Sequence, residues 1–394
     1  MKIAILHEML VKFGGAEKVV ESFLKIFPDA DLFTLVYDEK KMWWFFPKEK
    51  INTQVFSLPS QKRYNWTKKQ RVCLPLMPRS IEQLDFSKYD IVLCSSSGFA
   101  HWAITKPETK FIVYYHSPAR YLWDWTNEYK KDIWFSTGIK WFFLNKLFLK
   151  LRQWDIVASS RADISIANSN NTASRITKYY RKESEIIYPG VETERFAKKM
   201  KDLPQPLLVK EGGRKVPPLS KGRLGGVFSY YIIISALTEF KKIEVAIDAF
   251  NKMSGKKLVI IGQWNFRWEL ENLVESNNIT FIGPQYWDAL VSLVQNSSWL
   301  VFPGEEDFWI VPIEVMAAGK PVFAYKWWWL TETVLEWTTW EFFENKEWKD
   351  FVEKFKIFDK NNWKKKYKKD VCIKQAENFS IEVFEKKIKK LINK

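Results

Sequence analysis

The sequence predicts an α/β protein of two doubly wound domains, each built on a parallel sheet. Three observations lead to this prediction. The chain opens with a short apolar strand, a double-glycine turn and an amphipathic helix. Short apolar segments then recur through the first half of the chain and run into serine, glycine or proline. After an interruption rich in proline and glycine, the alternation of strand and helix starts again.

The first unit of this pattern begins with the run 2–6, which is apolar enough for a buried strand. Gly14 and Gly15 follow in the turn, and a helix is expected over 16–26, with Pro28 marking its end. A strand, a glycine turn and a helix in this order open a doubly wound sheet. Further strands of the first domain are expected at 90–94, 110–115, 164–167 and 185–188.

The segment 201–227 differs in composition, with four prolines and five glycines among basic residues and no periodic pattern of apolar residues. We interpret 196–228 as a linker or insertion between a first domain, 1–195, and a second domain, 229–375. Two parallel-sheet domains joined in this way would face each other across a cleft. Strands of the second domain are expected at 230–235, 257–261, 279–282, 299–302 and 321–325, with helices at 243–253 and 311–318.

Composition excludes several classes of protein. The chain has 394 residues, of which 46% are hydrophobic and 27% charged, so it is neither disordered nor collagen-like. Its three cysteines, Cys73, Cys94 and Cys372, are too far apart for a zinc site and odd in number, so we expect reduced, buried thiols in a cytoplasmic protein. We expect no signal peptide, because the N-terminus turns polar early, and no transmembrane helix, because no run reaches about 18 apolar residues.

The net charge of +16 predicts attraction to polyanions. Basic clusters lie at 62–63, 68–71 and 364–366, but no zinc finger, helix-turn-helix or RNA-recognition signature accompanies them, so we expect no specific nucleic acid partner. Together with the apolar run 141–151, which is interrupted by lysines, they indicate peripheral contact with an anionic membrane surface on its inner face. The alternative is a solvated basic face.

The most informative segment is 302–322, in which Glu306 and Glu314 stand eight residues apart. Glu306 falls in a loop after a strand, and Glu314 falls on the first turns of the next helix. A loop that enters a helix N-terminus offers free backbone amides and the positive end of the helix dipole, which suit a diphosphate. A glutamate just inside that helix can accept hydrogen bonds from ribose hydroxyls. The alternative for Glu314 is a glutamate that merely complements the helix dipole.

This segment resembles the Glu-x7-Glu donor motif of the retaining GT-B glycosyltransferases of family 4. The likeness is closest to the bacterial mannosyltransferase-like branch of surface-polysaccharide synthesis. It implies the GT-B fold, two Rossmann-like domains facing a central cleft, with a final helix in 376–394 that packs back on the first domain. Other matching strings extend over nearly the whole chain outside the insertion, at 7–17, 74–78, 115–124, 167–169, 188–192, 235–244 and 330–334.

The resemblance implies a donor-binding set. Lys241 would balance the charge of the leaving diphosphate, and Glu314 would hold the ribose. The family keeps an arginine where Ala236 stands here, so phosphate neutralisation would rest on Lys241 and its neighbour. The implied donor-binding residues are Gly14, Gly15, Lys241, Lys242, Phe308, Trp309, Ile310 and Glu314.

The resemblance also implies the catalytic groups. Glu306 would bind hydroxyls of the transferred sugar, and His116 would hydrogen-bond the sugar or its developing charge. Arg120 is the candidate on the acceptor side. Catalysis would consist of positioning and leaving-group stabilisation, with retention of anomeric configuration. The resemblance implies neither a metal nor a cofactor, and no Asp-x-Asp metal motif is assigned.

The predicted function is the transfer of a hexose, mannose by branch resemblance, from a nucleotide diphosphate sugar such as GDP-mannose. The acceptor would be a saccharide or a lipid-linked saccharide in cell-surface polysaccharide synthesis. Two alternatives stay open. A sugar-nucleotide epimerase on the same fold would need its own acid and base carboxylates. A catalytically inactive sugar-nucleotide-binding or basic scaffold protein would be compatible with Ala236 and Trp309.

The chain has 21 tryptophans and only 15 glycines. Several tryptophans stand where the family pattern has glycine, at turns that need a positive φ or a close backbone approach. We hypothesise that these are UGA codons, which some bacterial lineages read as glycine and others as tryptophan. The alternative is an aromatic platform for carbohydrate. The tryptophans concerned are Trp264, Trp268, Trp309, Trp327, Trp328, Trp329, Trp337 and Trp340.

Overall fold

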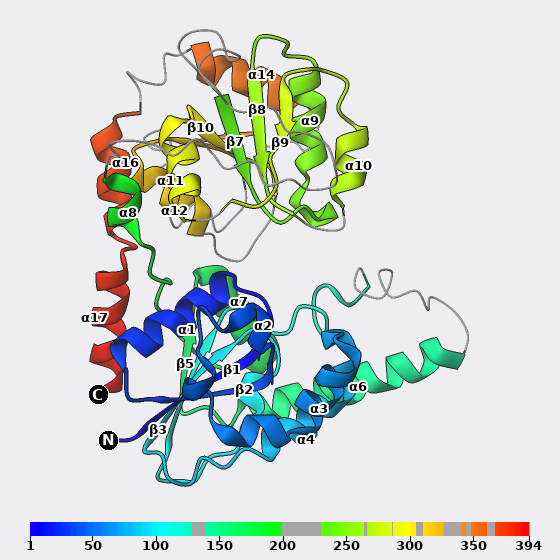
Figure 1. Ribbon diagram of the computed structural model, residues 1–394, viewed down its shortest axis with the longest axis vertical. Helices are drawn as coiled ribbons and strands as arrows, with labels where there is room; N and C mark the ends of the chain where they lie inside the picture. Colours follow the sequence, from blue (N-terminus) through cyan, green and yellow to red (C-terminus); the bar gives the residue numbers. More distant parts are fainter. Residues whose placement is uncertain are drawn as a thin grey trace. The chain divides into compact units, whose positions relative to one another are not determined.

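The computed structural model describes residues 1–127, 139–198, 230–263, 266–285, 287–304, 310–326, 340–343, 348–360 and 367–393. The chain divides into two compact units. Unit 1 holds residues 1–190 and 384–394, and unit 2 holds residues 191–383. Each unit contains a six-stranded sheet with helices beside it (Figure 1). The predicted fold class, two parallel-sheet α/β domains, is confirmed.

The sheet of unit 1 has the order β2-β1-β3-β4-β5-β6, and its paired strands are all parallel. The strand order reverses between β1 and β3, which is the point where ligands bind in open α/β sheets. The predicted strands are present, and the sequence analysis missed β2. The bounds are β1 (Ile3–Leu10), β2 (Asp31–Tyr37), β3 (Ile91–Ser96), β4 (Lys110–Tyr115), β5 (Ile164–Ala167) and β6 (Glu185–Ile186).

The sheet of unit 2 has the order β12-β11-β10-β7-β8-β9, again with parallel pairs. Its strand order reverses between β7 and β10. The sequence analysis missed β12. The bounds are β7 (Tyr230–Ile234), β8 (Lys257–Ile261), β9 (Ile279–Phe281), β10 (Trp299–Phe302), β11 (Val322–Tyr325) and β12 (Trp340–Phe343).

The helices form where apolar side chains recur at helical spacing. Helix α1 (Gly15–Ile26) buries Val19, Val20, Phe23 and Ile26, which lie on one side of the helix. Unit 1 also contains α2 (Glu39–Met42), α3 (Pro59–Thr67), α4 (Met77–Glu82), α6 (Ile139–Ser159) and α7 (Asn170–Tyr180), with the short η1 (Lys48–Lys50), η2 (Thr53–Ser57), η3 (Gln70–Leu76) and η4 (Ala100–Trp102). Unit 2 contains α8 (Thr193–Ala197), η5 (Glu239–Lys241), α9 (Ile243–Asn251), α10 (Arg267–Asn272), α11 (Trp287–Asn296), α12 (Ile310–Ala317), α14 (Trp348–Lys360) and α16 (Lys369–Glu377).

Helix α17 (Ile381–Ile392) closes the chain and spans the border between the units at 383/384. Its apolar side chains join the core of unit 1, where the ring of Phe384 lies 5.8 Å from that of Phe23 and 5.9 Å from that of Tyr114. Ile388 and Leu391 are buried in the same core. The last residues of the chain are therefore part of the first domain's interior.

Side chains alternate between two cores in unit 1. On β1, Ile5 packs on the side of α1 and α17, whereas Ala4 and Leu6 pack on the opposite face of the sheet. The same alternation places His7 and Glu8, the polar residues near the end of β1, on opposite faces of the sheet. All three cysteines are buried and free of disulfides. In the described part of the chain, no helix combines the length and apolar character needed to cross a membrane.

Candidate functional site

Two loops of unit 2 meet at the carboxyl ends of β7 and β10. Lys241 ends the short helix η5 after β7 and is only 3% exposed. Gly304 follows β10, and a Cβ atom there would lie 2.8 Å from the carbonyl oxygen of Lys241 and 2.9 Å from its Cα. Because backbone atoms cannot yield, this position requires glycine. The backbone that leads into the predicted donor loop therefore lies directly against Lys241.

A second glycine holds the loop after β7 in place. Gly262 has φ +151°, and a Cβ atom there would lie 1.8 Å from the carbonyl oxygen of Ser235. The amide of Ser235 donates to the carbonyl of Ile261, and the amide of Gly262 donates to that of Gly283. The ends of β7, β8 and β9 are thus joined. Sequence analysis did not name Gly262 as a site residue, although its place directly after a strand was a usable signal.

Glu314 lies on α12, the helix that follows the donor loop, and is 4% exposed. Ile310 is the first residue of that helix. A carboxylate buried this deeply within the second turn needs polar partners or a ligand hydroxyl. Lys242 takes a left-handed conformation and forms an ion pair with Glu244 at 3.5 Å. The predicted Glu306, Phe308 and Trp309 lie outside the described residues.

Gly14 and Gly15 lie where β1 gives way to α1. Gly14 is the N-cap residue of α1 in an extended conformation, and Gly15 is the first residue of the helix. No positive φ is required at Gly14. The glycines keep side chains away from the first turn of α1, whose backbone amides have no partners within the helix. This leaves an amide-rich helix start at the carboxyl end of β1.

His116 follows β4, and its amide donates to the carbonyl of Ser96 at the end of β3. Its Nε2 atom lies 2.8 Å from the hydroxyl oxygen of Ser95. Burial, together with the charge of nearby His7, lowers the pKa of His116 to about 3. The imidazole is therefore neutral at physiological pH and cannot act as a cation toward substrate.

His7 lies on the other side of Ser95 from His116, and Glu17 contacts His7; sequence analysis assigned neither of them a role. The Nδ1 atom of His7 lies 3.0 Å from Ser95 Oγ, and Nε2 lies 3.5 Å from a carboxylate oxygen of Glu17. Burial by itself lowers the pKa of His7, but the contact with Glu17 and the charge of Glu8 outweigh it, so the net shift is upward. The available signal was a polar pair, His7 and Glu8, inside an otherwise apolar strand.

Glu8 points to the other face of the sheet. Its carboxylate accepts hydrogen bonds from the backbone amides of Ser97, Gly98 and Phe99, in the loop after β3. The hydroxyl of Ser96 donates to the same carboxylate, and its oxygen also lies 3.0 Å from Nδ1 of His101. The loop after β3 is thus held by a buried carboxylate from β1.

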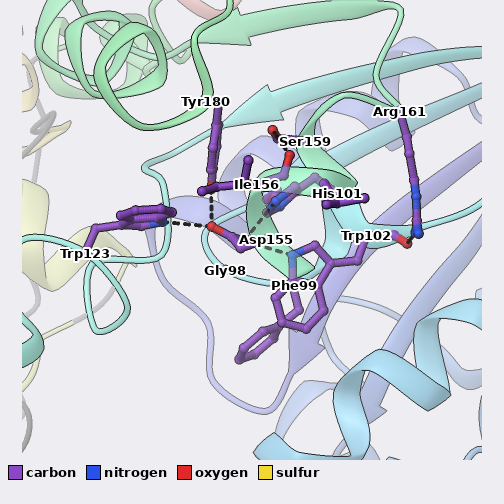
Figure 2. Close-up of polar contacts among 12 residues, drawn as sticks. Gly98, Phe99, His101, Trp102, Trp123, Asp155, Ile156, Ser159, Arg161 and Tyr180 are labelled. Atoms are coloured by element: carbon purple, nitrogen blue, oxygen red, sulfur yellow. Dashed lines mark hydrogen bonds and ion pairs between the residues drawn. The ribbon is translucent and has the colours of Figure 1, made fainter. Parts of the chain in front are cut away.

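The network continues to Asp155 on α6, whose side chain is fully buried (Figure 2). Its carboxylate accepts hydrogen bonds from the indoles of Trp102 and Trp123, each at 2.8 Å, and from the hydroxyl of Tyr180 at 2.9 Å. Nε2 of His101 lies 3.1 Å from the same carboxylate. Asp155 therefore ties α6 to three other segments of unit 1.

Arg120 lies in the loop after β4 and is already engaged. Its guanidinium stacks 3.7 Å above the ring centre of Trp125, and Nε lies 3.7 Å from the carboxylate of Asp124. Arg175 contacts the same carboxylate at 3.0 Å. The predicted acceptor-side residue is thus one member of a mixed cluster of charge and aromatic rings.

One Asp-x-Asp string does occur, at Asp29 and Asp31, and sequence analysis did not note it. Asp31 begins β2, at the amino end of a parallel strand, whereas His116 follows the carboxyl end of β4. The carboxylate of Asp31 is bound by the hydroxyl of Tyr89 and lies 3.7 Å from Nζ of Lys88. The string therefore lies at the opposite edge of the sheet from the candidate site.

Comparison with protein families identifies both units. The model for Glycosyltransferase Family 4 matches residues 13–195, and the model for Glycosyl transferases group 1 matches residues 227–379. The chain belongs to the GT-B glycosyltransferases. In this glycosyltransferase the first model begins after β1 and covers α1 and β2–β6, and the second covers the whole sheet of unit 2.

Two curated relatives align over part of their length. An uncharacterized glycosyltransferase of Methanocaldococcus jannaschii is 24% identical over 192 residues, which is 48% of this chain and 47% of the relative. The alpha-1,3/1,6-mannosyltransferase ALG2 of Candida glabrata is 26% identical over 205 residues, 41% of this chain and 42% of the relative. The chain thus matches less than half the length of either relative.

Solved structures resemble the glycosyltransferase over its full length. Anabaena HepE in complex with UDP-glucose has a TM-score of 0.70 at 14% identity, and the match covers 100% of both chains. Sucrose-phosphate synthase from Thermosynechococcus elongatus has a TM-score of 0.67 at 13% identity, with 99% and 98% covered. A Rickettsia africae glycosyltransferase has a TM-score of 0.61 at 17% identity, with 99% and 97% covered. At these identities the likeness concerns the fold.

Proposed function

We propose that this glycosyltransferase moves a hexose, with retention of anomeric configuration, from a nucleotide diphosphate sugar to a saccharide or lipid-linked acceptor of cell-surface polysaccharide. The observation that carries the proposal is the donor side of unit 2. There the backbone after β10 lies against buried Lys241, and buried Glu314 lies on the helix that follows. A cation and a carboxylate on either side of one loop suit a diphosphate and a ribose.

The proposed roles follow the chemistry of each group. Lys241, with Lys242, would balance the diphosphate as it leaves, and the amides at the start of α12 near Ile310 would bind its oxygens. Glu314 would accept hydrogen bonds from the ribose. Glu306 would bind hydroxyls of the transferred sugar, and His116 would hydrogen-bond that sugar. The proposal includes neither a metal nor a cofactor.

The choice of sugar is part of the proposal. Mannose with a GDP donor is supported by the branch resemblance and by the name of the Candida glabrata relative, a mannosyltransferase. A UDP-glucose donor is supported by the complex recorded for Anabaena HepE. We propose GDP-mannose first, because two resemblances point to mannose.

A panel of donors tests the function. The full chain is incubated with GDP-mannose or UDP-hexoses, with and without a lipid-linked saccharide, and nucleotide release and product anomeric configuration are measured. Acceptor-dependent release with retained configuration supports the proposal. Conversion of the donor sugar without nucleotide release would indicate an epimerase, and binding without any turnover would indicate an inactive protein.

We further propose that α6 rests on an anionic membrane surface on the cytoplasmic side. Figure 1 shows α6 extending beyond the sheet of unit 1. Its outward side exposes apolar residues, among them Phe142 at 61% and Val157 at 62%. Lys146 and Lys150 are exposed between them. Apolar side chains interspersed with lysine are typical of helices that lie in a membrane interface. The apolar residues of this α6 stripe are Phe142, Phe143, Leu149, Ile156 and Val157.

A further inference from the structure

Four polar side chains form one row at the carboxyl end of the sheet of unit 1. Glu17 on α1 contacts Nε2 of His7 at 3.5 Å. Nδ1 of His7 lies 3.0 Å from Ser95 Oγ, and Ser95 Oγ lies 2.8 Å from Nε2 of His116. The row therefore runs from the first helix, across β1 and β3, to the candidate catalytic histidine.

The sheet register assembles this row. His7 on β1 is the direct partner of Ser95 on β3, and β4, which ends just before His116, is the next strand. Because side chains alternate along a strand, Ser95 shares a face with His7, whereas Ser96 shares the opposite face with Glu8. A shift of one residue in the register would break the row.

The hydrogen positions in the row follow from which atoms can only accept. Nδ1 of His7 faces the backbone carbonyl of Ser95 at 3.2 Å as well as its hydroxyl. A carbonyl oxygen only accepts, so Nδ1 of His7 must carry a hydrogen. His7 consequently cannot accept a hydrogen bond from the hydroxyl of Ser95.

Ser95 is completely buried, so its hydroxyl hydrogen needs an acceptor inside the protein. Among the described residues, Nε2 of His116 is the one acceptor at hydrogen-bond distance that is left. Ser95 therefore donates to Nε2 of His116. A neutral imidazole that accepts at Nε2 carries its hydrogen on Nδ1.

We infer that Ser95, His7 and Glu17 are positioning residues that fix His116 as the Nδ1–H tautomer, so that Nδ1–H is the donor presented to an oxygen of the transferred sugar. This inference rests on the proposed function. Within the part of the chain that the structure describes, no residue accepts from Nδ1 of His116. The lowered pKa of His116 agrees with this arrangement, because burial is its first cause and the charge of His7, on the other side of Ser95, is its second.

The arrangement suits the charge that develops during transfer. A sugar that loses its diphosphate gains positive charge at the anomeric carbon. An imidazolium at His116 would repel that charge, whereas a neutral N–H donor orients an oxygen without opposing it. The row therefore fixes a neutral donor at His116 and places His7, the histidine whose pKa is raised, on the other side of Ser95.

The tautomer can be measured directly. Imidazole ¹⁵N NMR of the full chain labelled at histidine distinguishes a protonated nitrogen from an acceptor nitrogen without any substrate. We expect wild-type His116 to show a protonated Nδ1 and an acceptor Nε2. A wild-type His116 protonated at Nε2 would overturn the inference, even if the enzyme transfers sugar normally.

Variants then test the part played by Ser95. Ser95→Ala should mix the two tautomers of His116 and lower kcat about 10-fold, with donor KM changed less than about twofold. Ser95→Thr keeps a hydroxyl and should retain both the Nδ1–H tautomer of His116 and the wild-type kcat. Ser96→Ala is the matched control, since its hydroxyl faces Glu8 and His101, and it should leave the tautomer of His116 unchanged.

The outcomes separate the two proposals. An unchanged tautomer in Ser95→Ala would overturn the row, whatever the activity. A wild-type Nδ1–H tautomer in a protein that turns over no sugar nucleotide would overturn only the proposed function. If Ser95→Ala does not fold, the wild-type spectrum still decides the tautomer, and Ser95→Thr still tests the hydroxyl.

Discussion

His7 and Glu8 on β1, and Ser95 and Ser96 on β3, send alternate side chains to opposite faces of the sheet in unit 1. On one face the serine connects a histidine to His116. On the other, the serine connects a glutamate to His101 and so to Asp155. The two adjacent serines of β3 therefore take part in different networks, one on each face of the sheet. One row leads to the candidate site, and the other anchors α6.

Replacing Asp155 with asparagine tests the anchoring row. Asp155→Asn turns one acceptor into a donor that faces the indole and hydroxyl hydrogens around it, so we expect a loss of about 3 kcal/mol in unfolding free energy. Urea unfolding followed by circular dichroism measures the loss. Asp29→Asn, at an exposed position, is the control and should change stability by less than about 0.5 kcal/mol. Equal stability of the two variants would contradict the anchoring role.

Replacing Glu314 with glutamine tests the donor side. A charged acceptor of ribose hydroxyls is worth about 1.5–3 kcal/mol, so Glu314→Gln should weaken binding of the preferred nucleotide diphosphate sugar about 10-fold or more. Isothermal titration calorimetry with the donor measures the change. Glu353→Gln, exposed on α14, should bind like the wild type. Unaltered affinity in Glu314→Gln would remove Glu314 from the donor site.

Replacing Glu17 with glutamine tests the charge on His7 through pH. The folded-state pKa of His7 is raised above the ordinary 6.5, so its charge contributes stability that is fully present below pH 6.5 and is lost as the pH rises through the folded pKa. Glu17→Gln removes the main cause of the upward shift, and it leaves burial, which lowers the pKa, together with the smaller upward effects of Glu8 and the Ser95 carbonyl. We therefore expect the variant to lose this alkaline decline and to become less stable on acidification instead. Urea unfolding at a series of pH values measures the stability of both proteins, and NMR titration measures the pKa of His7 in each. The same pH profile in both proteins would argue against the ion pair.

At the scale of elements, α6 has apolar side chains on two sides. Phe148, Leu151 and Ala158 are buried in the core of unit 1, and the α6 stripe is exposed. The sequence analysis identified only a short apolar run with lysines in it, because a helix with apolar residues on two sides shows no clear helical periodicity. The exposed stripe can be distinguished only in the structure, which shows that the other side of α6 is buried in the core of unit 1.

Polar substitutions on the α6 stripe test membrane contact. Leu149→Ser with Val157→Ser removes two exposed apolar side chains without changing charge, and we expect the membrane-bound fraction to fall about 10-fold or more. Flotation with vesicles containing anionic lipid at low salt measures it, and added salt should weaken binding by screening the lysines. Trp268→Ser removes an exposed apolar side chain from unit 2 and should not reduce flotation. A wild-type protein that does not float would end the proposal.

Most strands could be predicted from the sequence, because short apolar runs are local, whereas the donor-side roles of Lys241 and Glu314 stay predictions. β2 was missed although it is a buried apolar run, because it leads into Asp38 and further charged residues and not into the serine, glycine or proline that marked the other strands. The row through His7, Ser95 and His116 was missed because the register between distant segments creates it. Glu306 and Trp309 lie outside the described residues. Their roles and the UGA hypothesis stay predictions, which the codon at position 309 tests directly.

At the scale of the whole molecule, the chain passes from unit 1 to unit 2 at 190/191 and returns at 383/384. The returning helix α17 contributes Phe384 and Ile388 to the core around Phe23 and Tyr114. The N-terminal domain is therefore incomplete without the C-terminal end of the chain. The fold places these residues in one unit, although they are far apart in sequence.

Removing the aromatic anchor of α17 tests this dependence. Phe384→Ala deletes a fully packed ring, and we expect about 3–5 kcal/mol of lost stability in unit 1. Urea unfolding followed by amide signals of β1 and β4 locates the loss in that unit. Lys386→Ala on the exposed side of the same helix is the control. Similar midpoints for the two variants would show that α17 adds little to unit 1.

The return of α17 to unit 1 also orders events during synthesis. Both chain ends belong to unit 1 (Figure 1), so unit 2 is in effect inserted into the first domain. On a translating ribosome, β1 to β6 emerge first, yet their apolar face against α17 stays uncovered until α17, which follows unit 2 in the sequence, has been made. Domains usually fold in the order in which they emerge. Here unit 1 begins first but is completed only after the whole of unit 2 has been made.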